Sequence, residues 1–311
     1  MTRLPPGSET GRVQRPSPLR PGARVRAIAP SGPFDHTLVW RGLAALAERY
    51  QVSYSREMFR RAGYLAGDDA RRAAELQAAL DDASLAAVVA ARGGYGLSRI
   101  ASRIDWSALA RHPKWLVGFS DITVLHLEAA RVGVASLHAH NVAGLGRYGA
   151  ERHAEWFAAL EGALTQRHAL VPVHVGDAAL QGRAVGPLAG GNLTLVATHS
   201  AARRLALPRG CILVLEEIAE APYRVDRALT ALLESGDLQG VSGVVLGDFI
   251  GCSPGRYGVE VEAVLAERLA ELEVPVARGL PIGHGEPNRP LPLGLEATLR
   301  VDASGASLSI A

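Results

Sequence analysis

Ser120 stands where an α/β enzyme would place a nucleophile. It follows the apolar run Trp115–Val117 and a Gly-Phe pair, and a helical pattern begins directly after it. This order of strand, turn and helix is that of a nucleophile elbow, although the residues after Ser120 depart from the GxSxG spacing. The free N–H groups of the first helical turn would point at charge developing beside the hydroxyl. Taken alone, the position is more simply that of an N-cap serine.

A serine nucleophile needs a base within hydrogen-bond reach, and a third group has to orient that base. Of the ten histidines, His284 lies between Gly283 and Gly285, which allow close approach of backbone and substrate. His138 and His140 also follow an apolar run, so they compete for the role or line the pocket. The residues alone leave this choice open.

The acidic pair Glu216-Glu217 supplies a carboxylate. It ends the run Cys211–Leu215, the most apolar segment of the second half of the chain. Neighbouring residues of a strand point to opposite faces, so only one of the two carboxylates should face a site. We expect Glu216 to be that residue; the alternative is a solvated pair of acids at a strand end.

Gly93 and Gly94 follow the apolar run Leu85–Ala90 in a turn that can present backbone N–H groups to a ligand. A phosphate-binding loop would need the spacing GxxxxGK[ST] or GxGxxG, and the sequence RGGYG has neither. An oxyanion hole needs only one such N–H group beside that of Asp121.

The elements that must position these residues alternate between strand and helix from Arg24 onward. This alternation predicts a parallel sheet with helices on both faces, in which ligands bind beyond the carboxyl ends of the strands. We predict four parts. They are a mobile tail at 1–20, an N-terminal α/β domain at 21–165 with the nucleophile, a linker at 166–180, and a C-terminal domain at 181–311 with Glu216 and His284.

Composition bounds the function. At 311 residues two domains are expected, and 48% hydrophobic with 21% charged residues is typical of a globular protein. Thirty-three basic against 31 acidic residues, without a basic run, argue against a nucleic-acid partner. No apolar stretch resembles a membrane span or signal peptide, which favours the cytoplasm. Cys211 and Cys252 form no metal-binding pattern, and a disulfide between them stays open.

Several ordered segments together resemble the LD-carboxypeptidase family, the serine peptidases of the muramoyltetrapeptide carboxypeptidase type with their microcin C self-immunity relatives. The resemblance covers nearly everything from Arg24 to the end of the chain. The segments are Ala29–Gly32, Gly63–Gly67, Ala91–Gly96, Gly118–Thr123, Gly190–Leu193, Leu215–Glu217, Ala221–Arg227 and Gly283–Gly285.

The resemblance implies a triad of Ser120 as nucleophile, His284 as base and Glu216 as orienting carboxylate. It implies an oxyanion hole from the N–H groups of Asp121 and Gly94, with Gly93 as the less favoured alternative. It also implies a Rossmann-like parallel sheet flanked by helices, a smaller β-rich C-terminal domain, a homodimer, and no metal or organic cofactor.

The implied reaction releases the terminal D-alanine of a cytosolic murein tetrapeptide during peptidoglycan recycling. The partner would be a small peptide with a free carboxyl terminus, which Arg92 or Arg224, with Gly93 nearby, would help to bind. Two alternatives remain. One is hydrolysis of peptidyl or aminoacyl nucleotides, as in microcin C resistance, and the other is a non-catalytic protein that binds small peptides.

Two segments depart from the family pattern. The residues His138-Ala139-His140-Asn141 stand where a His-Gly-Pro-like segment is usual, which puts the wall of the pocket in doubt. Glu216-Glu217 replaces the common Glu-Asp pair, a change that falls on the neighbour of the expected triad carboxylate.

Overall fold

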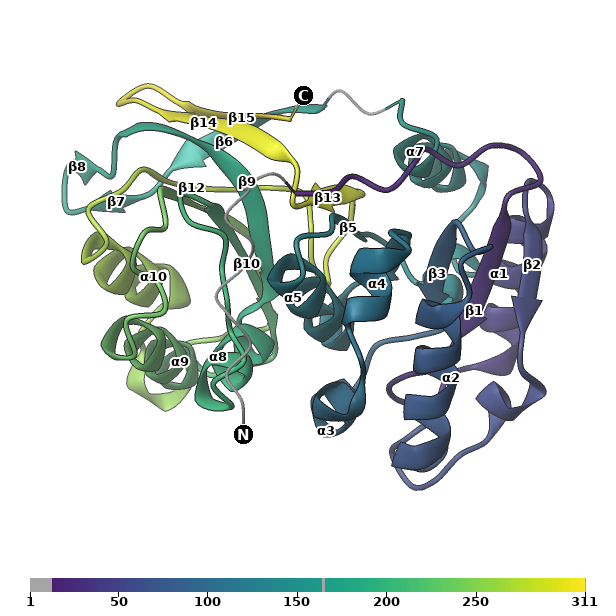
Figure 1. Ribbon diagram of the computed structural model, residues 1–311. Coiled ribbons are helices and arrows are strands. Elements are labelled where there is room, and N and C mark those ends of the chain that lie inside the picture. The colour runs from purple at the N-terminus through teal and green to yellow at the C-terminus, as the bar shows by residue number, and fades with distance from the viewer. Residues whose placement is uncertain (1–12, 164–165, 311) are drawn as a thin grey trace.

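The computed structural model describes residues 13–163 and 166–310, and it divides them into a sheet and a barrel (Figure 1). The sheet has six strands in the order β13-β5-β4-β3-β1-β2. Five of them pair in parallel and β13 is antiparallel to β5. The strands are β1 (Arg24–Ile28), β2 (Gln51–Tyr54), β3 (Ala87–Ala90), β4 (Trp115–Gly118), β5 (Ser136–His138) and β13 (Leu291–Leu293).

Helices cover both faces of this sheet because alternate residues of its strands point to opposite sides. Val89 and Val117 pack on one side in a core with α1 (His36–Ala47), α6 (Val142–Leu145) and α7 (Ala150–Leu160). Val88 and Leu116 pack on the other side in a second core. Its helices are α2 (Asp69–Asp81), α3 (Leu97–Ile100), α4 (Ser107–Arg111) and α5 (Thr123–Arg131).

The strand order places a topological switch point at β1. Strand β1 lies between β2 and β3. The chain therefore runs from β1 to β2 on one side and then crosses to β3 on the other side of β1. Ligands of open α/β sheets bind at such a switch point. The segments after β1, β3 and β4 are Ala29–Gly32, Ala91–Gly96 and Phe119–Ile122, all of which the sequence had singled out.

The second half is a closed barrel in the order β10-β11-β12-β6-β15-β14-β9. Helices α8 (Leu193–Ala201), α9 (Pro222–Glu234) and α10 (Val261–Ala270) pack against it around a third apolar core (Figure 1). The strands are β6 (Gln166–Pro172), β9 (Gly182–Asn192), β10 (Ile212–Ile218), β11 (Gly243–Ile250), β12 (Val276–Arg278), β14 (Glu296–Val301) and β15 (Ala306–Ile310). The prediction of an α/β fold with a parallel sheet and a β-rich C-terminal half is confirmed.

Short elements complete the fold. A two-stranded ribbon joins β7 (His174–Val175) to β8 (Ala178–Ala179). The 3₁₀ turns are η1 (Arg56–Phe59), η2 (Ala101–Arg103), η3 (Ser120–Ile122) and η4 (Gly255–Tyr257). None of the helices in the described ranges combines the length and the apolar character needed to cross a bilayer.

Among the contacts that join the sheet to the barrel, two lie next to the residues of interest. Strand β13 comes after barrel strand β12 in the chain, yet it pairs with β5 at the edge of the sheet, with Leu291 opposite His138. Asn192, at the end of barrel strand β9, donates its backbone N–H to Oγ1 of Thr123 at the start of α5, at 3.0 Å. The carboxyl ends of β4 and β9 therefore meet.

The structure departs from two expectations on organisation. Residues 166–180 were expected to form a linker, but β6 pairs with β12 and β15 as part of the barrel. Its alternating burial shows the period of a half-buried strand, which its polar residues had hidden. The expected mobile tail is wrong for residues 13–20, because Leu19 is buried and the Ser17 carbonyl accepts a hydrogen bond from the Trp115 indole. Residues 1–12 lie outside the described ranges.

Candidate active site

Ser120 has the backbone of a strained elbow. Its φ angle is +66°, the left-handed region that residues with a Cβ rarely adopt. The turn is tight because η3 begins directly after Phe119, and the backbone of Gly93 approaches from the neighbouring loop. A Cβ added at Gly93 would lie 2.9 Å from Cβ and 3.2 Å from Oγ of Ser120. A strained, closely packed serine at a strand end is characteristic of a nucleophile and unusual for a simple N-cap.

His284 and Glu216 form a hydrogen-bonded pair. Nδ1 of His284 lies 2.8 Å from Oε2 of Glu216, whose side chain is fully buried. If Nδ1 donates to the carboxylate, Nε2 remains as the proton acceptor that a base requires. The His284 ring lies 5.1 Å, centroid to centroid, from the ring of Phe119, the residue before Ser120. The pair therefore sits beside the elbow.

The charges around this pair favour a protonatable histidine. Burial opposes a charge on His284, but the Glu216 carboxylate, with Glu217 and Asp248, outweighs burial and raises the pKa of His284. Burial also raises the pKa of Glu216, and the His284 ring partly offsets this. The arrangement stabilises an imidazolium next to a desolvated carboxylate, which is the state formed when a base has taken a proton.

Residues absent from the sequence-based list hold the His284 loop. Asn288 accepts a hydrogen bond through Oδ1 from the Gly283 N–H at 3.1 Å, and Oδ1 lies 3.1 Å from Nε2 of His138. Asp248, on β11, accepts one from the Gly285 N–H at 3.1 Å. Asn288 lies in an irregular segment, and Asp248 lies on a strand that contains no motif. In the sequence, only the segment Gly283–Gly285 indicated a tightly held loop.

The rings of His138 and His140 each lie 6.0 Å, centroid to centroid, from the ring of Phe119. Burial lowers the pKa of His138 to about 3 and that of His140 to about 4, so both rings are neutral near pH 7. The backbone carbonyl of His140 accepts a hydrogen bond from the Trp156 indole. His138 is joined to the His284 loop through Asn288, while His284 alone of the three pairs with Glu216.

Glu217 points away from Glu216, as the strand period predicts. Oε1 accepts a hydrogen bond from the Asn192 side chain at 2.8 Å, and Oε2 accepts bonds from the N–H and hydroxyl of Thr194 at 2.9 and 2.7 Å. Asn192 caps α8 and Thr194 lies in its first turn. Glu217 thus stabilises the start of a helix, where an anion is favoured.

The candidate oxyanion hole lies where β3 and β4 end. The Gly93 carbonyl accepts a hydrogen bond from the Gly32 N–H at 3.1 Å, which turns this peptide toward the loop after β1. In the described part of the chain, the N–H groups of Gly94 and Asp121 donate to no backbone carbonyl. Their use as an oxyanion hole stays a prediction.

The two arginines suggested for the substrate carboxylate are both exposed. Arg92 donates from Nη1 to the Pro33 carbonyl at 2.5 Å. Arg224, in the first turn of α9, contacts the Tyr223 hydroxyl at 3.1 Å and Glu220 at 3.3 Å. Cys211 and Cys252 are buried and free, and the residues described contain no cluster of three or more His, Cys, Asp or Glu side chains suited to a metal ion.

Comparison with known proteins agrees with this architecture. Residues 25–139 match the LD-carboxypeptidase N-terminal domain and residues 185–299 match the LD-carboxypeptidase C-terminal domain. A Streptomyces coelicolor protein assigned by name as a carboxypeptidase is 41% identical, over 94% of this chain and 96% of its own. The murein tetrapeptide carboxypeptidase of Pseudomonas aeruginosa is 36% identical, over 89% and 92% of the two chains.

Solved structures agree as well. The crystal structure of muramoyltetrapeptide carboxypeptidase from Oxalobacter formigenes has a TM-score of 0.78 and 29% identity, covering 92% of this chain and 98% of that one. A microcin C7 self-immunity protein in complex with aspartyl sulfamoyl adenosine has a TM-score of 0.79 over 94% of this chain and 97% of its own. At 20% identity, the latter shows a shared fold alone. The chain belongs to the LD-carboxypeptidase family and is a serine-type carboxypeptidase.

Proposed function

We propose that this protein removes the terminal D-alanine from a murein tetrapeptide, at the bond between the L-centre of the diamino acid and D-alanine, in peptidoglycan recycling. The observation that carries the proposal is the buried Glu216 carboxylate hydrogen-bonded to His284, next to the strained turn at Ser120. The names of the Pseudomonas and Oxalobacter relatives support the choice of substrate.

In the proposed first half-reaction, Oγ of Ser120 attacks the carbonyl carbon of the scissile bond while Nε2 of His284 takes its proton. The carbonyl oxygen becomes an oxyanion and is stabilised by the N–H groups of Asp121 and Gly94. Glu216 holds the imidazole in the required tautomer and stabilises its charged form. Collapse of the intermediate breaks the peptide bond, and His284 returns the proton to the leaving D-alanine amine.

In the second half-reaction, His284 removes a proton from water, whose oxygen attacks the ester carbonyl of the acyl-Ser120 intermediate. The ester bond breaks, Ser120 regains its proton from His284, and the tripeptide leaves with a new carboxylate. The terminal carboxylate of the substrate needs a cation, for which Arg92 and Arg224, both exposed, are the candidates, with Gly93 beside the reacting hydroxyl.

The decisive experiment incubates the purified protein, in parallel, with a murein tetrapeptide and with an aminoacyl-sulfamoyl adenosine. Release of free D-alanine and a tripeptide from the first substrate alone is expected. Exclusive turnover of the second substrate would replace the proposal by the nucleotide-hydrolase alternative. Binding of the tetrapeptide without turnover would leave a peptide-binding protein.

We further propose that the protein acts in the cytoplasm as a homodimer, without a metal or organic cofactor. Light scattering after size exclusion is expected to give twice the chain mass of 32.7 kDa. Undiminished turnover after dialysis against a chelator is expected as well, and a loss restored by one metal ion would contradict the cofactor part.

A further inference from the structure

We infer that Arg72, on α2, is a positioning residue that holds the loop bearing the Gly94 N–H in place for attack by Ser120. The inference rests on the proposed function, because it assumes that this N–H receives the oxyanion. Arg72 belongs to no motif that the sequence singled out, and α2 carries none of the expected active-site residues.

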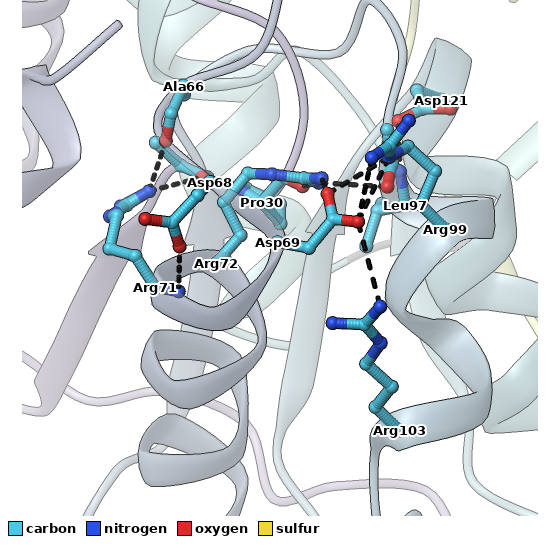
Figure 2. Close-up of polar contacts among 12 residues, drawn as sticks. Pro30, Ala66, Asp68, Asp69, Arg71, Arg72, Leu97, Arg99, Arg103 and Asp121 are labelled. Atoms are coloured by element: carbon cyan, nitrogen blue, oxygen red, sulfur yellow. Dashed lines mark hydrogen bonds and ion pairs between the residues drawn. The ribbon is translucent and has the colours of Figure 1, made fainter. Parts of the chain in front are cut away.

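The side chain of Arg72 is fully buried and ends between two backbone loops. Its Nη1 donates to the carbonyl of Pro30, after β1, at 2.5 Å and to the carbonyl of Gly96, after β3, at 2.8 Å. Figure 2 shows this guanidinium reaching from α2 across Pro30 toward Asp69. One cation thus joins the loop after β1 to the loop after β3.

Both bonds act on the segment with the candidate oxyanion hole. Gly96 lies two residues after Gly94, so its carbonyl fixes the far end of the turn. The loop of Pro30 continues to Gly32, whose N–H donates to the Gly93 carbonyl at 3.1 Å. Arg72 therefore restrains the peptide units on both sides of the Gly94 N–H.

A third bond connects this segment to the nucleophile turn. Oδ2 of the buried Asp121 accepts a hydrogen bond from the Leu97 N–H at 3.0 Å, directly after Gly96. Asp121 is also the residue whose own N–H is the other half of the proposed oxyanion hole. Its side chain thus holds the loop that contains Gly94, and Figure 2 shows Asp121 and Leu97 close to Arg99 and Asp69.

A carboxylate on the same helix holds the Arg72 guanidinium in turn. Its Nη2 contacts Oδ1 of Asp69 at 2.5 Å, and Asp69 accepts further bonds from Arg99 at 2.9 Å. The planar guanidinium can bond two carbonyls and a carboxylate at once in a fixed geometry, which a lysine ammonium cannot reproduce. Oxyanion-hole donors act only when they are preorganised to within a fraction of an ångström, so a rigid support of this kind affects the reaction rate.

A purely structural role would be the alternative, and the chain contains a matched control for it. Lys114 is also a fully buried cation, and its Nζ donates to the backbone carbonyls of Ala79, Leu80 and Asp82, at 2.9, 2.8 and 2.7 Å. These carbonyls end α2 and lie outside the active-site loops. Arg72→Met and Lys114→Met therefore both remove a buried cation, but only the first removes bonds to the loops after β1 and β3.

The experiment measures kcat and KM for the tetrapeptide, the rate of covalent labelling of Ser120 by a fluorophosphonate, and Tm. For Arg72→Met we expect kcat to fall about 10-fold to 100-fold, with KM changed less than about threefold, because the lost interaction acts in the transition state. Labelling should slow by a similar factor, since the phosphonyl oxygen uses the same N–H groups. Lys114→Met should lower Tm with kcat and labelling close to those of the unaltered protein.

Arg72→Lys is the second variant, because it keeps a cation and is the more conservative change if Arg72→Met does not fold. It should lie between Arg72→Met and the unaltered protein in both rates. Rates for folded Arg72 variants equal to those of Lys114→Met would overturn the inference. An unaltered protein that labels at Ser120 but leaves the tetrapeptide intact would instead refute the proposed function, and labelling would still test Arg72.

Discussion

The end of β4, which carries Ser120, and the end of β10, which carries Glu216, lie in different halves of the molecule and are held differently. At β4 the backbone itself is constrained, with φ of +66° at Ser120 and the Gly93 backbone packed against the side chain. At β10 the backbone is extended, although its pairing with β11 shifts register between Leu215 and Glu217, and the constraint is a hydrogen bond from the buried Glu216 carboxylate to a loop histidine. The proposed nucleophile is thus placed by steric fit, and the proposed base by its hydrogen bond to a buried carboxylate.

Substitution of the two central residues should separate these mechanisms most strongly. Ser120→Gly and His284→Ala should each lower kcat by about 10⁴-fold or more, because each removes a member of the proposed triad. Stability should differ. Ser120→Gly relieves the strain of the positive φ, so it should be more stable than Ser120→Ala. We expect its free energy of unfolding to be higher by roughly 1 kcal/mol.

His284→Ala leaves the buried Glu216 without its partner and should destabilise the fold by about 3 kcal/mol or more near pH 7, less if the carboxyl takes up a proton. Denaturant unfolding of the three variants measures the contrast. Equal stability of Ser120→Gly and Ser120→Ala would contradict the role of strain. A His284→Ala variant as stable as the unaltered protein would contradict the role of the buried pair of Glu216 and His284.

Glu216→Gln should lower kcat/KM by roughly 10³-fold to 10⁴-fold and should also shift its pH dependence. The base acts in its neutral form, so activity rises as pH passes upward through the pKa of His284. Glu216 contributes to raising that pKa, and the amide removes the contribution. The acid limb of the profile should therefore move to lower pH while the plateau falls. A limb that stays in place or moves upward would show that His284 is not the group observed.

Gly93→Ala tests the steric side of the comparison. The new Cβ would lie 2.9 Å from Cβ of Ser120, so the nucleophile or the loop must shift. We expect a fall in kcat of about 10²-fold, the size that an ångström of misplacement can cause. Gly305→Ala is a suitable control, because a Cβ there meets no atom within 4 Å and its φ is not positive. Equal kcat for the two variants would argue against tight packing at Ser120.

Glu217→Gln should have the smallest effect on activity. It weakens the bonds to Asn192 and Thr194 at the start of α8, so the free energy of unfolding should fall by about 1–2 kcal/mol. Its carboxylate adds to the raised pKa of His284, so kcat/KM should change by less than about tenfold. Thermal unfolding together with steady-state kinetics checks both parts. A loss as large as that of Glu216→Gln would mean that the two carboxylates share one role.

The sequence carried enough information to predict the parallel sheet, because buried strands read as continuous apolar runs and glycine-rich turns mark where they end. Strands β3 and β4 are apolar on both faces, and both were predicted correctly. Their residues on the two faces include Val88, Val89, Leu116 and Val117. Strand β6 was missed because it alternates polar with apolar residues and was interpreted as a connection. The strand period also separated Glu216 from Glu217 without knowledge of their partners.

By itself, the sequence determined the local settings of Ser120, Glu216 and His284, since each depends on residues within a few positions of it. Which histidine pairs with Glu216 was decided only by the tertiary structure. The chain leaves the barrel after β12, passes through His284 and adds β13 to the edge of the first sheet, and this path brings His284 to the ring of Phe119. Arg72 donates to a backbone carbonyl that is distant from it in the sequence, and Asn288 accepts from a backbone N–H within a loop that has no periodicity. No spacing rule records such contacts, because a backbone carbonyl or N–H has no side chain to mark it.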